Sequence, residues 1–208
     1  YIKGIKIPQN DNIFELGKKV HAMINYKLQG FDMDLMEKAA DETTLTHYKS
    51  ILNHKLMKQK PFLTEWGFLV NIADTQNLLA GRIDAIFFDE KENIYTIADW
   101  KTGMNIPKNA IESPQALIYM YSFFKAQNDL KIKITPEQIR FMFIQTPSLK
   151  ESEVWFSTEL KEKIEKDFLS MIKSMKKTNF KETNKPEQCK ICEYNFVCSK
   201  NPIRFQPV

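Results

Sequence analysis

The sequence is poor in several features, and each shortage excludes a class of protein. No run approaches the roughly 20 apolar residues that a membrane-spanning helix needs, and the first residues do not resemble a signal peptide. We therefore expect no membrane contact. The three cysteines all lie between residues 189 and 198, which argues against a disulfide framework and predicts a reducing compartment.

The remaining composition suits a globular chain with a slight excess of positive charge. Its 208 residues fit one domain, or one domain with a small appendage, and 43% of them are hydrophobic, which is enough for a sizeable core. The net charge of +4 favours anionic partners, but it is too small to establish nucleic-acid binding by itself.

Hydrophobic periodicity predicts helices near both ends of the chain and strands between them. Apolar residues recur at helical spacing over 12–28, 32–60 (with an interruption near 41–44) and 160–175, and Pro114 opens a helix that reaches residue 126. Residues 62–72, 78–88, 93–100 and 138–145 are typical of buried strands, and 154–156 of a short one. This order predicts an α/β fold, a central mixed β-sheet flanked by helices.

Two acids and a lysine fall on two successive predicted strands. Residues 90–93 suit a hairpin loop, which would place Asp84 opposite Asp99 at roughly 5 Å between Cβ atoms. Because side chains alternate along a strand, Lys101 shares a face with Asp99, and Asp84 shares one with Ile86 and Phe88. A lone D-x-K on a solvated sheet is common, but two carboxylates this close in an apolar setting predict a divalent cation between them.

Four short motifs occur in the order found in one nuclease family. They are Gly17-Lys-Lys-Val-His21 (G-x-x-x-H), Gly81-Arg-Ile-Asp84 (G-x-x-D), Asp99-Trp-Lys101 ((D/E)-x-K) and Gln115-Ala-Leu-Ile-Tyr119 (Q-x-x-x-Y). Each is weak alone, but together they resemble the RecB-like exonucleases of the PD-(D/E)xK superfamily, which act in CRISPR adaptation and in recombination complexes. The resemblance spans residues 17 to 119 and implies a restriction-endonuclease-like core of order α-β-β-β-α-β.

The resemblance also implies a divalent cation, Mg²⁺ or Mn²⁺, and assigns its ligands. Asp84 and Asp99 would hold the cation through carboxylate oxygens, together with the Trp100 backbone carbonyl. His21 would add an imidazole, which suits Mn²⁺ better than Mg²⁺. Lys101 would orient or help deprotonate the attacking water and stabilise the transition state. The predicted catalytic residues are therefore Asp84, Asp99 and Lys101.

Five further residues near the motifs have weaker interpretations. Glu65 lies on the preceding predicted strand and is an additional metal ligand, a support for the ligands, or a solvated residue. Gln115 and Tyr119 are one helical turn apart, and the resemblance implies that they contact DNA or organise the site; helix packing through Tyr119 is the alternative. His47 and His54 show no partner pattern, and we expect both on the surface.

Cys189, Cys192 and Cys198 form the pattern C-x₂-C-x₅-C. It resembles the last three ligands of the 4Fe–4S cluster found in several members of the family, where a fourth cysteine precedes the histidine motif. This sequence has no such cysteine, and these clusters normally take four thiolates. The alternatives are a cysteine before Tyr1 in a longer chain, a fourth ligand of another kind, a zinc ion in place of the cluster, a vestigial site, or three inert thiols.

These patterns predict a divalent-metal-dependent DNA nuclease in residues 1–180, with a cysteine-bearing segment, 181–208, packed on the same domain. The resemblance favours a cytoplasmic exonuclease, prokaryotic or phage-encoded, that acts on single-stranded DNA or DNA ends in repair, recombination or CRISPR adaptation. A helicase or a CRISPR integrase is a candidate partner. The alternatives are a structure-selective or site-specific endonuclease and a catalytically retired DNA-binding subunit; the intact acids and lysine argue against the latter.

Overall fold

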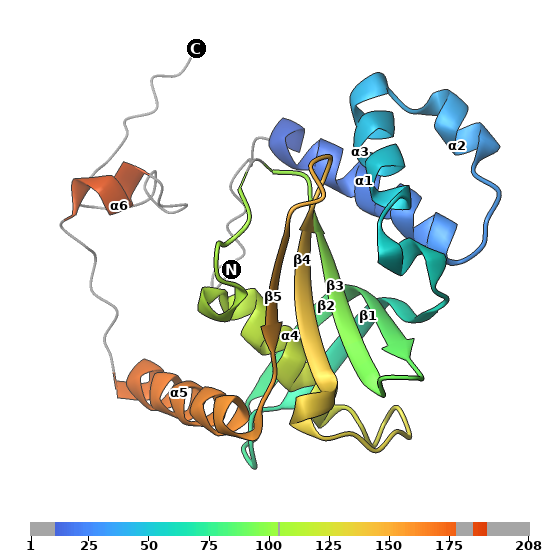
Figure 1. Cartoon of the computed structure of the whole chain (residues 1–208). Coiled ribbons are helices and arrows are strands. Elements are labelled where there is room, and N and C mark those ends of the chain that lie inside the picture. Colours follow the sequence, from blue (N-terminus) through green and yellow to red (C-terminus); the bar gives the residue numbers. More distant parts are fainter. Residues whose placement is uncertain (1–10, 104, 178–184, 191–208) are drawn as a thin grey trace.

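A five-stranded sheet forms the centre of the computed structural model, which describes residues 11–103, 105–177 and 185–190 (Figure 1). The strands lie in chain order: β1 (Pro61–Asn71), β2 (Leu78–Asp89), β3 (Ile94–Lys101), β4 (Ile139–Gln145) and β5 (Glu151–Trp155). β3 and β4 run parallel, and the other neighbours run antiparallel. The sheet is therefore mixed, as predicted.

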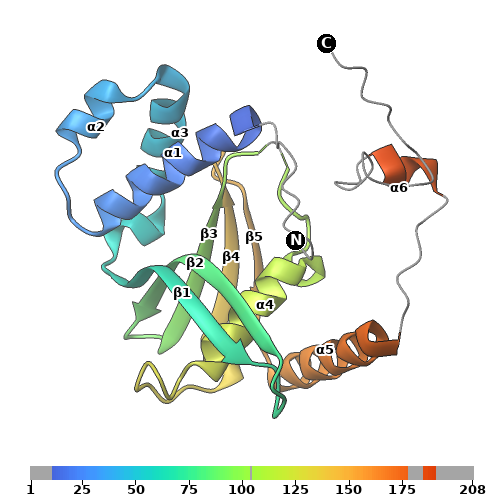
Figure 2. The same cartoon turned by 180° about the vertical axis from the view of Figure 1, so that it is seen from behind.

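Helices cover both faces of this sheet (Figures 1 and 2). One face carries α1 (Asp11–Leu28), with α2 (Asp34–Ala39) and α3 (Glu42–Leu52) beyond it, and the other carries α4 (Pro114–Lys125), against which α5 (Thr158–Lys177) packs. Within the described residues, three 3₁₀ turns lie in the connections: η1 (Lys55–Lys58), η2 (Ala110–Glu112) and η3 (Pro136–Gln138). The predicted α/β fold with a central mixed sheet is confirmed. Of the helices in the described residues, none has the length and apolar character to cross a bilayer.

The sheet separates two apolar cores. Strand residues alternate between them, so Tyr95 and Ile97 join the core beneath α4, whereas Ala98 and Trp100 join the core beneath α1 and α3. Apolar residues at helical spacing complete each core from the helix side. Val20 of α1, for example, belongs to the core that contains Ala98 and Trp100. The residues of β3 therefore face the sides that the sequence predicted.

The hairpin between β2 and β3 has the predicted loop and register. Asp89 pairs with Ile94, and residues 90–93 form the loop between them. The Asp89 carboxylate accepts hydrogen bonds from the backbone N–H groups two and three residues on, at 3.0 and 3.2 Å, which favours a turn here. Asn93 has a φ of 55°, in the left-handed region that asparagine tolerates. Continued toward the other end, this register sets position 84 opposite position 99.

The alternation of β1 and β2 breaks at Glu65 and Asp84. Glu65 has a φ of 47°, and it stands outside the β1–β2 ladder although both of its neighbours pair with β2. On β2, Ile83 and Ile86 join the same core although they are three residues apart. The prediction that Asp84 shares a face with Ile86 and Phe88 was therefore wrong. Asp84 instead contacts His21 of α1.

The prediction that His47 and His54 lie on the surface was also wrong for His54. His54 is 4% exposed; its Nδ1 accepts from the Leu56 N–H at 3.3 Å, and its Nε2 donates to Glu151 Oε1 at 2.9 Å. His47 is half-buried and forms a hydrogen bond of 2.8 Å with Thr146 Oγ1. Both contacts join segments almost 100 residues apart, so no local pattern reveals them.

The C-terminal segment 181–208 is described over residues 185–190. They contain α6 (Pro186–Lys190), in which Cys189 is half-buried. Cys192 and Cys198 lie outside the described residues. The cysteine site and the packing of this segment on the nuclease domain therefore stay predictions.

Candidate active site

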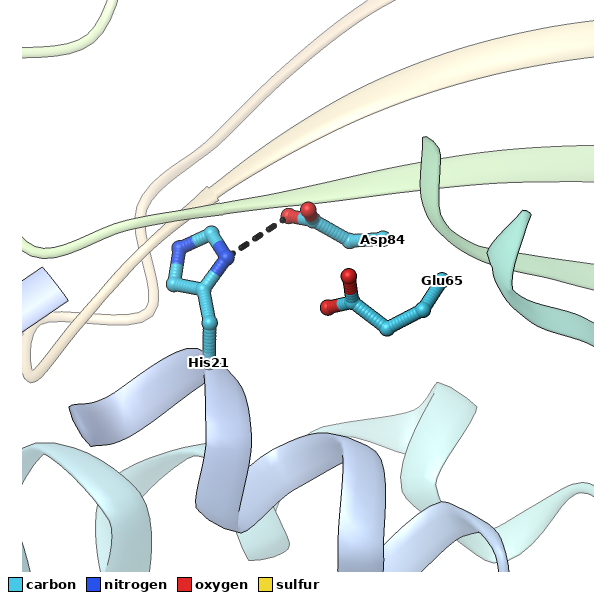
Figure 3. A group of neighbouring side chains, drawn as sticks. All are labelled: His21, Glu65 and Asp84. Carbon is cyan, nitrogen blue, oxygen red and sulfur yellow. Dashed lines mark ion pairs between the residues drawn. The ribbon is translucent and has the colours of Figure 1, made fainter. Parts of the chain in front are cut away.

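A cleft of about 740 Å³ lies between α1 and the strands β1 and β2. Within it, His21, Glu65 and Asp84 each present one ligand atom, and these atoms lie within 4.8 Å of one another (Figure 3). One residue comes from the helix and two come from neighbouring strands. An imidazole nitrogen and two carboxylate oxygens at this spacing are a suitable donor set for Mg²⁺ or Mn²⁺.

Two contacts fix the ring of His21. Nε2 lies 2.8 Å from the Trp100 carbonyl oxygen, and because a carbonyl can only accept, Nε2 carries a proton and donates it. Nδ1 then faces Asp84 Oδ2 at 3.3 Å (Figure 3). A backbone carbonyl holds metal-binding imidazoles in the same way, so Nδ1 is the atom that His21 offers to a cation.

The charge on His21 depends on its acidic neighbours. Burial lowers the pKa of His21, but the hydrogen bond that Asp84 accepts from the ring and the charges of Asp84 and Asp99 outweigh it, and the net shift is upward. The negative charge of Asp84 thus stabilises the protonated ring of His21. Because a metal ligand must be neutral imidazole, cation binding at Nδ1 is expected to release a proton.

Asp84 is held by the backbone of the next strand. Its Oδ2 accepts a hydrogen bond of 3.0 Å from the Trp100 N–H. The N–H of Trp100 thus contacts Asp84, and its carbonyl contacts His21. The first position of the same motif, Gly81, lies against Phe68. A Cβ at position 81 would lie 2.5 Å from Phe68 Cζ, which is closer than packed atoms approach, so any other residue there would displace the Phe68 ring.

Glu65 points into the cleft from the irregular point of β1 (Figure 3). Burial raises the pKa of Glu65, and the nearby Arg82 opposes this shift. Arg82 Nε lies 2.8 Å from Glu65 Oε2. The structure therefore places Glu65 beside His21 and Asp84 rather than on a solvated strand. The sequence did not reveal the contact with Arg82, although Arg82 lies inside the G-x-x-D motif.

Asp99 and Lys101 form a second group on the α4 side of the sheet. Lys101 Nζ lies 2.7 Å from Asp99 Oδ2. The Gln115 amide joins the pair: its Nε2 donates to Asp99 Oδ1 at 2.7 Å, and its Oε1 accepts from Lys101 Nζ at 2.9 Å. Gln115 Nε2 also contacts the Tyr119 hydroxyl at 3.0 Å, and the Lys101 ammonium lies 5.2 Å from the ring centre of Phe143. Gln115 and Tyr119 thus lie beside two predicted catalytic residues.

The structure brings the predicted ligand set together in part. Asp99 is not a member of the group within 4.8 Å that the described residues form, and Glu65 occupies that third place. The two groups still interact electrostatically. Burial, followed by the charge of Asp84, raises the pKa of Asp99 to about 6, although Lys101 and His21 oppose the shift.

This raised pKa predicts a pH dependence of stability. Because the folded protein binds a proton on Asp99 more tightly than the unfolded chain does, stability falls as the pH rises from about 4 to 6. We expect a loss on the order of 2 kcal/mol across this window in the presence of EDTA, measured by urea unfolding. Asp99→Asn, which cannot ionise, should remove the decline; the same decline in that variant would assign it to another group.

A mixed sheet that presents two acids and a lysine beside a helix-borne imidazole defines a nuclease-type α/β protein. The family comparison makes this specific: a model of the PD-(D/E)XK nuclease superfamily matches residues 35–199. The chain belongs to this superfamily. The matched range contains the acids, Lys101 and the cysteines, and it begins after His21.

Similarity to individual proteins is much lower. No curated protein matches the chain. Among solved structures, the chain is similar to the crystal structure of SSO0001, with 14% identity and a TM-score of 0.39 over 97% of this chain and 99% of that one. It is also similar to a protein from Eubacterium rectale named "Putative exonuclease", with 9% identity and a TM-score of 0.49 over 93% and 77% of the two chains.

Proposed function

We propose that the protein is a divalent-metal-dependent DNA nuclease of the RecB-like branch, and specifically an exonuclease on single-stranded DNA or DNA ends. The observation that carries the proposal is the convergence of His21, Glu65 and Asp84 in one cleft, with the Asp99–Lys101 pair on the adjacent strand. The order of the four motifs supports the exonuclease branch. The intact acids and lysine favour an active enzyme over a retired DNA-binding subunit.

The residues of the cleft and the Asp99–Lys101 pair would divide the chemistry between them. His21, Glu65 and Asp84 would hold Mg²⁺ or Mn²⁺, which when bound lowers the pKa of a coordinated water and neutralises charge on the phosphate. The resemblance adds Asp99 to this set. It also implies the Trp100 carbonyl, which in the structure instead accepts a hydrogen bond from His21 Nε2 at 2.8 Å. Lys101, held in place by Asp99 and Gln115, would donate to the water or to the phosphate as charge develops.

The function is tested on end-labelled DNA substrates. Purified protein with Mn²⁺ or Mg²⁺ is incubated with linear single strands, linear duplexes and closed circles. We expect degradation of linear single strands and protection of circles. Cutting of circles would establish the endonuclease alternative instead, and DNA that stays intact on every substrate would contradict the nuclease proposal.

Glu65→Gln distinguishes a metal ligand from a passive neighbour. The substitution keeps the size of the side chain but removes one negative charge from the donor set. We expect the Mn²⁺ concentration for half-maximal cleavage to rise about tenfold, with the maximal rate largely recovered at high Mn²⁺. Glu92→Gln, in the exposed hairpin loop, is the matched control. Equal metal dependence in both variants would remove Glu65 from the ligand set.

We also propose that the three C-terminal cysteines hold a 4Fe–4S cluster or a zinc ion. The spacing C-x₂-C-x₅-C and the resemblance support this proposal. Anaerobically prepared protein should show a broad visible absorption band if it holds the cluster. A colourless protein that binds stoichiometric zinc supports the second form, and a protein with neither metal contradicts both.

A further inference from the structure

Arg82 forms an ion pair with one of the candidate metal ligands although it lies at the solvent edge of the cleft. Its Nε contacts Glu65 Oε2 at 2.8 Å, and the side chain of Arg82 is 71% exposed, compared with 22% for Glu65. A guanidinium has five N–H donors, and this contact uses one of them. In the described part of the chain, the structure gives the guanidinium no second ion-pair or hydrogen-bond partner. Arg82 therefore has N–H groups left that can donate hydrogen bonds to an anion in the cleft.

The ion pair and a cation compete for the same carboxylate. Glu65 lies among the three ligand atoms that meet within 4.8 Å, and Arg82 lines the same cleft. A divalent cation on Glu65 would lie close to the positive guanidinium, and like charges at this range repel. Cation binding therefore weakens the hold of Glu65 on Arg82.

The position of Arg82 suits a phosphate as its second partner. Arg82 and Asp84 are two residues apart on β2, and the side chains of both line the cleft. A guanidinium matches the oxygens of a phosphate with two parallel hydrogen bonds, which an ammonium cannot do. Exposed ion pairs contribute little to stability, so exchanging Glu65 for a phosphate is not opposed by a large loss.

We propose that Arg82 exchanges partners: it neutralises Glu65 in the metal-free cleft, and it binds a phosphate of the DNA strand once a cation occupies the Glu65 carboxylate. This inference rests on the proposed function and assigns Arg82 a positioning role for the substrate. The exchange makes the metal-free cleft less acidic, and it makes tight strand binding depend on the cation.

The exchange predicts effects of opposite sign in Arg82→Ala. We expect Mn²⁺ to bind the DNA-free variant about two- to fivefold more tightly than the wild type, because the competing cation is gone; electron paramagnetic resonance of free Mn²⁺ measures this. At saturating Mn²⁺, KM for a single-stranded oligonucleotide should rise about tenfold because a charged phosphate contact is lost. Arg82→Lys should restore Mn²⁺ affinity toward the wild-type value while KM stays raised.

Two further variants control the measurement. Lys18 lines the same cleft and pairs with Glu15 rather than Glu65, so Lys18→Ala should leave Mn²⁺ affinity unchanged. In a Glu65→Gln background, Arg82→Ala should no longer tighten Mn²⁺ binding. Unchanged or weaker Mn²⁺ binding by Arg82→Ala, in a protein whose wild type binds Mn²⁺ and cleaves, overturns the exchange and leaves the nuclease function standing. A wild type that neither binds Mn²⁺ nor cleaves overturns both.

Discussion

We expect Asp84→Asn to abolish cleavage and to leave the protein folded. The substitution removes a charged ligand from the centre of the donor set, where Asp84 also contacts His21. We expect the cleavage rate on linear single strands to fall at least about 10³-fold, which corresponds to about 4 kcal/mol of transition-state stabilisation. Asparagine can still accept the Trp100 N–H through its carbonyl oxygen. The melting temperature should therefore change by roughly 2–4 °C, as for a loss of about 1 kcal/mol.

Asp89→Asn is the matched control for this variant. It makes the same chemical change on the same strand, at the hairpin end and outside the cleft. Asparagine can also keep the turn contacts of Asp89, so we expect wild-type cleavage. Substantial cleavage by Asp84→Asn at saturating Mn²⁺ would show that the cation, if needed, is held elsewhere.

Lys101→Met is expected to separate catalysis from metal binding. Methionine keeps the length of the side chain but removes the ammonium that would act on the water or the phosphate. We expect a loss of about 10²–10⁴-fold in rate, with Mn²⁺ affinity close to that of the wild type, because an ammonium has no lone pair for a cation and Lys101 contacts Asp99 and Gln115. A parallel loss of Mn²⁺ binding would mean that Lys101 acts by shaping the metal site.

The same variant has a stability signature. Asp99 is 2% exposed, and Lys101→Met removes the ion pair that stabilises its charge. A buried charge without a partner costs about 3–5 kcal/mol, so the pKa of Asp99 should rise further. The stability deficit relative to the wild type should therefore be larger at pH 8 than at pH 5. Lys91→Met, in the exposed hairpin loop, should show no such pH dependence.

The sequence predicted most of the fold because its signals are local. The polar loop at residues 90–93 fixed the register of the hairpin, and alternation assigned the faces of β3. The interruption predicted near residues 41–44 corresponds to Asp41, whose carboxylate accepts the Thr44 N–H at 2.9 Å and caps α3. Each of these features depends on residues within one turn or one hairpin.

The arrangement of the site required information that is not local. A left-handed residue in the middle of β1 has no signal in a glutamate, because glycine and asparagine are the usual residues there. Glu65, at this irregular point, and Asp84 of the neighbouring strand lie beside His21 of α1, while Asp99 contacts Gln115 of α4. The motifs therefore predicted that His21 and Asp84 lie together, while the choice between Glu65 and Asp99 beside His21 depended on three-dimensional packing.

The peptide groups of Trp100 offer a spectroscopic reporter for the cleft. The Trp100 N–H donates to Asp84 and the Trp100 carbonyl accepts from His21, while the indole is buried in the core beneath α1. In ¹⁵N-labelled protein, the backbone amide resonance of Trp100 should move when a cation engages Asp84, whereas the indole N–H resonance should stay in place. One tryptophan thus supplies both the probe and its internal reference, so ligand occupancy can be followed without DNA and without turnover.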